Sequence, residues 1–409
     1  MKQLVVWCFT LLCLSACDSE STLVDGGQLS EDVLAAATSI TESDYLEKIS
    51  IIAHDSMGGR DTPSEGLNKT ASWIASEFER MGLSPGGDDG SFMQYYPIET
   101  LRPARGLSSA EMGGKGLVFG EEIVVVNGVG QADIQGDVVV VAGLGDLTES
   151  VASSIDGKIV LAVSMAEGYR THRRAVSDLR RAGALTVLVS VEKNDQVWNT
   201  GAEVLAARNT MRIGSGGSSS NVAFEIRDAV VEEILSGYGM DLYSMRNTRG
   251  VEAIETGGMQ AALSPRSDMV KQESAPNVVG ILEGSDPDLR GEYIAYSAHM
   301  DHVGIGRPNL DLDSIYNGAD DDASGTIGIV EIAEAFASME VKPKRSSIFL
   351  LVSGEEKGLW GSAFFADNPP VPVDQIVANL NADMIGRNWS DTVVVIGKEH
   401  SDLGSTLNQ

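Results

Sequence analysis

The sequence has only three cysteines, and all of them lie at its N-terminal end, at Cys8, Cys13 and Cys17. The remainder of the chain therefore contains no disulfide, no thiolate metal ligand and no cysteine nucleophile. Histidine is also scarce, with five residues in a chain of 409. A metal ion bound by the folded part must therefore be held by histidine, aspartate and glutamate.

Basic residues are few as well: 30 Lys and Arg stand against 59 Asp and Glu, which gives a formal net charge of −29. So acidic a surface argues against a nucleic acid or an anionic membrane surface as a partner. Hydrophobic residues make up 43% of the chain and charged residues 22%, which is ordinary for a globular protein. With 409 residues, the chain is long enough for two domains of about 150 residues each.

The first 17 residues, MKQLVVWCFTLLCLSAC, combine one lysine, a short apolar run and small residues before Cys17. This pattern predicts a secretory signal peptide at residues 1–17. Its last four residues, LSAC, resemble a bacterial lipobox; an ordinary signal peptide or a short membrane anchor is the alternative. The lipobox hypothesis places a lipid on Cys17 and makes the polar residues 18–43 a tether. It predicts an exported, membrane-anchored lipoprotein that faces the periplasm or the cell exterior and contacts the membrane only through that lipid.

Hydrophobic spacing divides the rest of the chain into three parts. Between residues 44 and 82 the spacing is helical and predicts two helices. Between about residues 120 and 258, short β-branched runs predict a strand-rich module with only two helices, near residues 175–182 and 229–236. From residue 275 onward strands alternate with helices, which predicts an α/β fold with a mixed, mostly parallel sheet and helices on both faces.

Clusters of acidic and imidazole side chains follow the strands of this last part. In open α/β sheets, ligands bind beyond the carboxyl ends of the strands, so residues that follow successive strands are expected to meet. A further cluster opens the helix between the first two of these strands. The clusters are His299 and Asp301 in AHMDHVG, Asp320, Asp321 and Asp322 in NGADDDASG, Glu355 and Glu356 in GEEKGLWGS, and Asp383 in NADMIGR.

Each cluster alone has a structural explanation, as a buried histidine, a solvated turn or a helix cap. Together they suit a co-catalytic zinc centre, in which one carboxylate bridges two cations about 3.5 to 4 Å apart. The adjacent Glu355 and Glu356 point in different directions from an extended backbone, so one can bind metal while the other faces water. Asp301, two residues after His299, is placed to accept the second N–H of that imidazole.

In this order and spacing, the four motifs resemble those of the di-zinc aminopeptidase family, which includes bacterial leucyl aminopeptidases and relatives of glutamate carboxypeptidase. Residues 58–85 resemble that family's N-terminal helices, and IDGKIVLAVS followed by RRAGALTVLVS resembles its protease-associated domain. The resemblance implies a zinc exopeptidase fold in two parts, residues 44–119 and 263–409, with an inserted protease-associated-type domain at residues 120–262.

The resemblance also implies the roles of the site residues. His299, Asp321 and Asp383 would hold one zinc ion, and Asp321 would bridge to a second zinc ion that Glu356 also holds. Glu355 would be the general base, which takes a proton from the attacking water and passes it to the leaving amine of a peptide substrate. The peptide bond that follows Asp321 is expected to be cis.

One feature departs from the family pattern. The family's fifth protein ligand, a histidine on the second zinc, lies well beyond the position of Asp383, whereas this chain ends at Gln409. We therefore expect a C-terminally truncated member with one complete three-ligand site and a second zinc site that lacks its histidine. His400 could substitute, although its position matches an ordinary strand end in the family, and His302 is not predicted to bind metal.

Several other functions fit parts of the pattern. Fe(II) oxygenases also use an HxD motif with a distant histidine, but on an all-β barrel rather than on alternating helices and strands. A receptor or structural ectodomain that keeps the fold, or an inactive fragment, is a second alternative. Carboxypeptidase and glutaminyl cyclase specificities are not separated by these motifs. The intact Glu355 and metal ligands favour a zinc-dependent exopeptidase, and we favour an aminopeptidase that removes N-terminal residues from peptides.

Overall fold

A computed structural model describes residues 31–404, with gaps at 129–130, 144–145, 164–168, 215–221, 390–391 and 401–402. The predicted signal peptide, Cys17 and residues 18–30 of the predicted tether lie outside the described residues. The rest of the predicted tether contains helix α1 (Glu31–Ser39) and the start of α2 (Glu42–Ile52). Among the helices that are described, none is long and apolar enough to cross a bilayer.

The two helices predicted between residues 44 and 82 are confirmed, and their sequence signals explain where they begin and end. α2 begins after Thr41, whose hydroxyl accepts a hydrogen bond from a backbone N–H of the first turn. α3 (Glu65–Met81) begins in the same way after Ser64. It ends at Gly82, which takes the left-handed conformation (φ 76°) common after helices.

The first of two sheets carries the predicted catalytic motifs. Its strands lie in the order β15-β13-β14-β12-β2-β9, with β1 beside β12. β13 pairs in parallel with β14 and β15, but β12 runs antiparallel to β14 and to β2. The prediction of a mixed sheet is confirmed; the prediction that it is mostly parallel is wrong for the described strands, because β2 and β12 form a long antiparallel pair. The strands are β1 (Ser84–Pro85), β2 (Met93–Pro103), β9 (Thr210–Ile213), β12 (Ser267–Leu282), β13 (Tyr293–His299), β14 (Ser346–Val352) and β15 (Ile376–Asn381).

Helices cover both faces of this sheet, as predicted. β14 is buried along its whole length, and its successive side chains point to opposite faces. Phe349 and Leu351 pack with α3 and with α9 (Gly325–Ser338) in one core. Ile348 and Leu350 pack against α10 (Trp360–Asp367) on the other face, in a second core.

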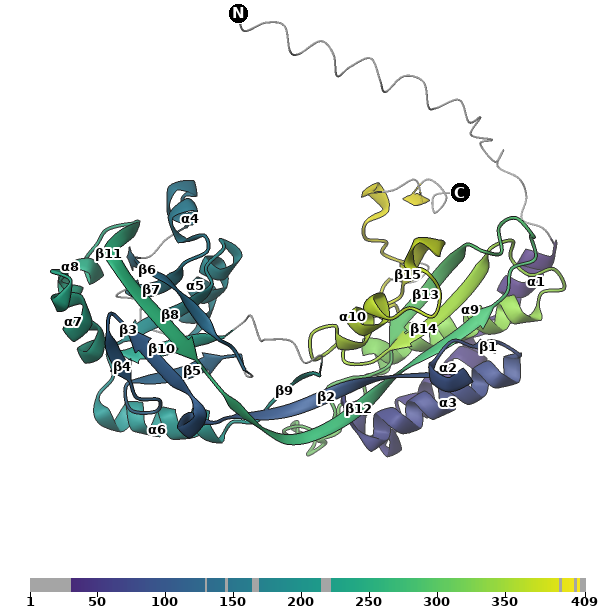
Figure 1. Ribbon diagram of the computed structural model, residues 1–409. Helices are drawn as coiled ribbons and strands as arrows, with labels where there is room; N and C mark the ends of the chain where they lie inside the picture. The colour runs from purple at the N-terminus through teal and green to yellow at the C-terminus, as the bar shows by residue number, and fades with distance from the viewer. Residues whose placement is uncertain are drawn as a thin grey trace, which may run out of the picture.

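The second sheet forms a separate lobe, which the long strands β2 and β12 connect to the first (Figure 1). Its order is β4-β3-β11-β6-β7-β8-β10-β5, with parallel pairing from β6 to β10. β3 and β4 precede residue 120, the predicted start of the insert, and β9 lies inside the predicted insert but pairs with β2. The strands are β3 (Ser109–Met112), β4 (Lys115–Leu117), β5 (Ile123–Asn127), β6 (Ile134–Gly143), β7 (Ile159–Val163), β8 (Thr186–Val191), β10 (Ala223–Arg227) and β11 (Val251–Ser264).

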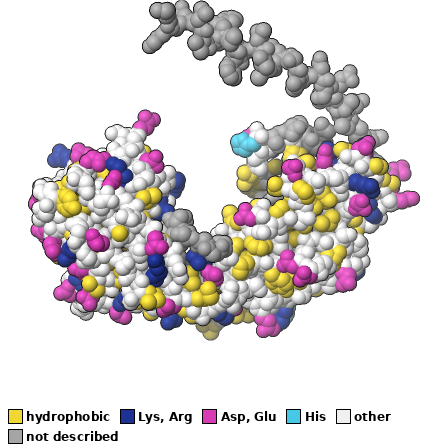
Figure 2. Space-filling view, in the orientation of Figure 1, with side chains coloured by type: hydrophobic (Ala, Val, Ile, Leu, Met, Phe, Trp, Pro, Cys, Tyr) yellow, Lys and Arg dark blue, Asp and Glu magenta, His cyan; other side chains and the backbone are white. Residues whose placement is uncertain are grey.

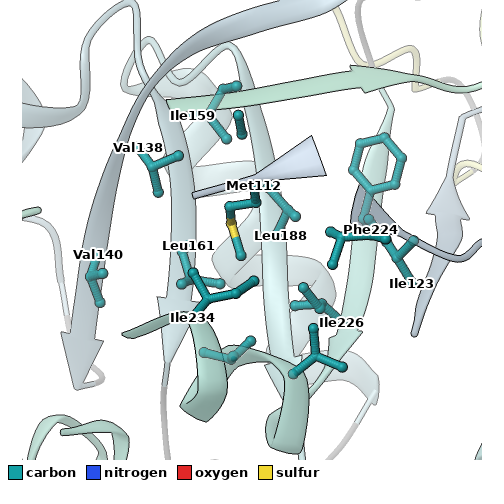
Figure 3. Close-up of a cluster of buried hydrophobic side chains, with 14 of the residues drawn as sticks. Met112, Ile123, Val138, Val140, Ile159, Leu161, Leu188, Phe224, Ile226 and Ile234 are labelled. Atoms are coloured by element: carbon teal, nitrogen blue, oxygen red, sulfur yellow. The ribbon is translucent and has the colours of Figure 1, made fainter. Parts of the chain in front are cut away.

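This lobe has its own hydrophobic cores, one on each face of its sheet. Figure 3 shows one of them, in which Met112 lies among aliphatic side chains of the sheet and Ile234 of a covering helix. The two helices predicted here are confirmed as α5 and α7, and α4, α6 and α8 are additional. The helices are α4 (Glu149–Ile155), α5 (Tyr169–Arg181), α6 (Asp195–Ala207), α7 (Asp228–Gly237) and α8 (Leu242–Arg246). The short helical turns of the whole chain are η1 (Asp55–Arg60), η2 (Asp88–Gly90), η3 (Arg105–Leu107), η4 (Ala319–Ser324), η5 (Val373–Gln375) and η6 (Lys398–His400).

The surface differs between the two lobes. Figure 2 shows acidic side chains over both lobes, and hydrophobic side chains gathered on the lobe that contains the first sheet. Val377 on the edge strand β15 is 51% exposed, and Trp389 beyond it is 78% exposed. The many acidic side chains on the surface agree with the negative net charge. The exposed hydrophobic side chains lie on the lobe that carries the catalytic motifs.

A buried lysine fastens α2 to α9. Lys48 Nζ lies 2.6 Å from a carboxylate oxygen of Glu331, 2.6 Å from one of Glu334 and 2.8 Å from one of Asp44. Burial works against its charge, but these hydrogen bonds raise the pKa of Lys48 above its ordinary value. The three carboxylates are close enough together to bind a metal ion, yet the lysine ammonium already supplies their cation.

Replacing this lysine should destabilise the fold. Lys48→Met keeps the chain length but leaves the buried Glu331 without its cation, so we expect the free energy of unfolding to fall by about 3 kcal/mol. Lys69→Met is the control, because its ammonium pairs with Glu65 at the surface, where both side chains are more than half exposed. That change should cost about 0.5 kcal/mol or less. Urea denaturation measures both values, and equal losses would contradict the role of Lys48.

Candidate metal centre

The predicted site residues meet at the carboxyl edge of the three parallel strands. β13 ends at His299, Glu355 and Glu356 follow the end of β14, and Asp383 follows the end of β15. The turn η4 carries Asp321 to the same edge, where it contacts the first of these residues. Because parallel neighbours end at the same side of a sheet, residues up to 84 positions apart in the chain become neighbours in space.

His299 forms one group with Asp321 and Asp383. Its Nε2 atom lies 3.2 Å from Asp321 Oδ1 and 3.8 Å from Asp383 Oδ1. The His299 side chain is 4% exposed, whereas those of Asp321 and Asp383 are 35% and 45% exposed. The group therefore presents a fixed imidazole from the interior and two carboxylates from the solvent side, which are ligand types that zinc accepts.

The three adjacent aspartates have different partners. Asp320 Oδ1 accepts the N–H of Gly386 at 2.9 Å. Asp322 is buried, and its two oxygens accept backbone N–H groups from the end of β13, the start of α9 and the loop after β15. It lies close to the His299 group, but these contacts make it a support rather than a ligand. Asp321 is the one that faces the imidazoles, and the bond between Asp321 and Asp322 is cis, as predicted.

Asp301 supports His299 in a different way from the one predicted. The His299 Nδ1 atom lies 3.2 Å from the backbone oxygen of Asp301 and 3.6 Å from its carboxylate, so the carbonyl is the nearer acceptor. The carboxylate instead accepts the Thr62 hydroxyl at 3.0 Å and the N–H of Glu355 at 3.3 Å. Asp301 therefore links the imidazole, the N-terminal segment and the Glu355 loop.

Arg60 holds the backbone around the centre. Its side chain is fully buried, and its guanidinium donates to the carbonyl oxygens of Met300, Ile52, Asn317 and Gly318. Burial lowers the pKa of Arg60 to about 10, which still leaves it charged at neutral pH. A fixed positive charge thus lies behind the loops that carry the metal-ligand candidates.

A second group contains a histidine that is not among the predicted ligands. His302 Nδ1 lies 2.9 Å from Glu356 Oε1 and 3.9 Å from Asp321 Oδ2, and these three side chains are close enough together to bind one cation. The second site is predicted to lack a histidine; the structure places His302 there, while the exposed His400 belongs to neither group. The signal in the sequence was a second histidine within three residues of His299, directly after a strand.

The electrostatics of the centre suit a cation. Burial works against charge on His299, but the carboxylates of Asp301, Asp322 and Asp383 raise its pKa to about 9. Burial raises the pKa of Asp322 to about 7. Burial and the neighbouring carboxylates also raise the pKa of Glu355. The donor set fits a metal ion, because the buried atoms Nδ1 of His302 and Oε1 of Glu356 form no hydrogen bond with any described residue.

Comparison with known families agrees with this chemistry. Residues 277–409, which contain all the metal-ligand candidates, match Peptidase family M28. This part of the chain is similar to a peptidase M28 domain. The name of a curated relative, "Probable zinc metalloprotease", gives zinc as its metal.

Three curated fungal proteins match parts of the chain. A "Probable zinc metalloprotease" of Pyricularia oryzae is 36% identical over 168 residues, which cover 40% of this chain and 29% of that protein. A second one, of Leptosphaeria maculans, is 31% identical over 28% of this chain and 25% of that protein. A "Vacuolar membrane protease" of Tuber melanosporum is 27% identical over 37% of this chain and 16% of that protein. The chain thus aligns with less than a third of the length of each of these relatives.

Solved structures similar to the chain include two bacterial aminopeptidases. The aminopeptidase from an Aneurinibacillus species is 18% identical, with a TM-score of 0.41, over 87% of this chain and 73% of that one. The zinc aminopeptidase BSAP of Bacillus subtilis is 19% identical, with a TM-score of 0.38, over 85% of this chain and 70% of that one.

Thr62 offers a test of how the centre is supported. Thr62→Val keeps the side-chain shape but removes the hydroxyl that donates to Asp301 and accepts the N–H of Gly354. The Asp301 carboxylate would lose a donor, and we expect zinc affinity to fall about 10-fold to 100-fold. Thr62→Ser keeps the hydroxyl and should retain the affinity. Competition with a zinc chelator measures both, and indistinguishable affinities for the two variants would contradict this support.

Proposed function

We propose that this protein is a zinc-dependent exopeptidase of the aminopeptidase type, which hydrolyses peptides at their N-terminal residue. The observation that carries the proposal is the convergence of His299, Asp321, Glu356 and Asp383 beside Glu355 at one edge of the sheet. The expected metal ligands and the expected base therefore lie at one place.

The chain's own residues would divide the work of hydrolysis. When bound, zinc lowers the pKa of water and polarises a carbonyl group. Glu355 would accept the proton of the attacking water and return it to the departing amine. Its raised pKa suits this task, because a base with a pKa closer to neutrality both accepts and returns a proton readily. Asp301 would position Glu355, since its carboxylate accepts the Glu355 N–H.

The charge around the site favours a free peptide N-terminus over a free C-terminus. Carboxylates surround the centre, and they attract an ammonium group and repel a carboxylate group. Two nearby cationic side chains already have partners within the protein. Arg60 is buried against backbone carbonyls, and Lys357 pairs with Asp61 at 2.6 Å. This supports an aminopeptidase over a carboxypeptidase. The proposal includes export and attachment to a membrane through a lipid on Cys17.

Glu355→Ala tests the proposed base. Because Glu355 is not a metal-ligand candidate, zinc content should stay unchanged while kcat falls about 10²-fold to 10⁴-fold. Glu340→Ala, an exposed acidic residue after α9, is the matched control and should leave both unchanged. Zinc content by mass spectrometry and peptide hydrolysis provide the readouts. Full hydrolysis by the Glu355 variant would rule out its role as base.

Substrate specificity is tested with paired peptides that differ only at their ends. We expect hydrolysis of peptides with a free N-terminus and none of the same peptides after N-acetylation, because the acetyl group removes the ammonium charge that the acidic site attracts. Amidation of the C-terminus should leave the rate unchanged. Cleavage restricted to N-acetylated peptides, or loss of cleavage on C-terminal amidation, would contradict the aminopeptidase proposal.

A further inference from the structure

Three consecutive residues of the N-terminal segment reach three different parts of the centre. The Arg60 guanidinium donates to backbone carbonyls near the metal-ligand candidates. The Thr62 hydroxyl donates to the Asp301 carboxylate and accepts the N–H of Gly354. Asp61 lies between these two in the sequence and makes the third contact, with the turn that carries the proposed base.

Close packing of the backbone fixes where Asp61 lies. Gly58, Gly59 and Arg60 have φ values of 56°, 67° and 53°, in the left-handed region, which costs free energy for a residue with a side chain. The N–H of Gly304 donates to the Gly59 oxygen at 3.0 Å, and a Cβ atom at Gly304 would lie 2.6 Å from the Cβ atom of Asp61. Asp61 therefore has little freedom to move away from the loop after β13.

The proposed base lies on a tight turn, residues 354–359, which we call the base turn. The N–H groups of Gly358 and Leu359 both donate to the backbone oxygen of Glu355, at 2.8 and 3.0 Å. Gly358 has a φ of 107°, a conformation that favours glycine. These features set the shape of the base turn. Its position relative to the metal-ligand candidates depends on contacts with other segments.

Lys357 connects the base turn to the N-terminal segment. Its Nζ atom lies 2.6 Å from Oδ1 of Asp61, and the two side chains are 24% and 37% exposed. Water and salt screen a partly buried ion pair less than a fully exposed one. We propose that the ion pair of Asp61 and Lys357 holds the base turn in place, so that both are positioning residues for Glu355. This inference rests on the proposed function, because it takes Glu355 as the base.

A purely electrostatic role for these two side chains makes a different prediction. Removing the positive charge of Lys357 would raise the pKa of a neighbouring carboxyl group, and removing the negative charge of Asp61 would lower it. The two changes would then act on the reaction in opposite directions. Loss of a positioning contact has the same consequence whichever partner is removed, so the two single variants distinguish the roles.

The first experiment compares Lys357→Met with Asp61→Asn in peptide hydrolysis. Zinc is kept in excess, so that loss of metal does not limit the rate, and the substrate is a peptide with a free N-terminus. We expect kcat to fall about 10-fold or more in both variants, because a misplacement of about 1 Å can cost about 100-fold in rate. KM should stay within about twofold of the wild-type value, since neither side chain is proposed to bind the substrate.

Three further variants show whether the two residues act as a pair. The double variant Asp61→Asn/Lys357→Met should lose no more activity than the worse single variant, because both changes break one contact. Lys357→Arg keeps the positive charge and should restore most of kcat. Lys69→Met, which removes an exposed ion pair with Glu65, is the control and should leave kcat unchanged.

A second measurement does not depend on hydrolysis. Hydrogen–deuterium exchange followed by mass spectrometry reports how often the backbone of residues 354–359 opens. We expect exchange there to become at least about 10-fold faster in Lys357→Met and in Asp61→Asn, and to stay near the wild-type rate in Lys357→Arg and Lys69→Met. Circular dichroism verifies that all variants are folded.

The outcomes separate this inference from the proposed function. Faster exchange and a lower kcat in both single variants would support it. Unchanged exchange, effects of opposite sign on kcat, or faster exchange with an unchanged kcat would overturn it and leave the proposed peptidase intact. A wild type that hydrolyses no peptide with zinc would overturn the proposed function and the role of Glu355, whereas exchange would still show whether the ion pair holds the base turn.

Discussion

The edge of the sheet at β13, β14 and β15 gathers more negative charge than it could hold without positive partners, and the rest of the site follows from that constraint. Backbone N–H groups donate hydrogen bonds to the carboxylates of Asp320 and Asp322. The Thr62 hydroxyl donates one to the carboxylate of Asp301. Arg60 adds a buried positive charge behind them. Asp321, Glu356 and Asp383 remain directed at the two imidazoles, where a bound metal ion would balance their charge.

The parts that satisfy this constraint come from distant regions of the chain. The first sheet supplies the ligand candidates, and the N-terminal segment, which the second lobe separates from them in sequence, supplies their support. Arg60 donates to carbonyls beside His299 and before η4, and the Tyr45 hydroxyl donates to the backbone oxygen of Ser324 at 2.7 Å. The paired strands β2 and β12 belong to the first sheet and connect it to the second lobe, so the chain leaves and re-enters the first sheet along neighbouring strands. Precise side-chain placement at the centre thus depends on packing across the whole first lobe.

Much of this arrangement was predictable from sequence. Helical spacing predicted α2 and α3, the alternation of strands and helices after residue 275 predicted the sheet of β13 and β14, and the residues after those strands marked the site. His302 was not predicted to bind metal, and only the three-dimensional path of the loop after β13 brings its ring to Glu356. The antiparallel pairing of β2 with β12 and that of β3 with β11 join residues far apart in the chain, which local periodicity does not encode. The nearer acceptor of the His299 N–H, a carbonyl instead of a carboxylate, depends on sub-ångström geometry.

The central claim of the proposal is that His299, Asp321 and Asp383 hold a zinc ion beside Glu355. Crystals grown with zinc, with diffraction data collected on both sides of the zinc absorption edge, test it most directly. The account predicts an anomalous peak next to Nε2 of His299 and within reach of the carboxylates of Asp321 and Asp383. No peak at this edge of the sheet, or none beside His299, would contradict it.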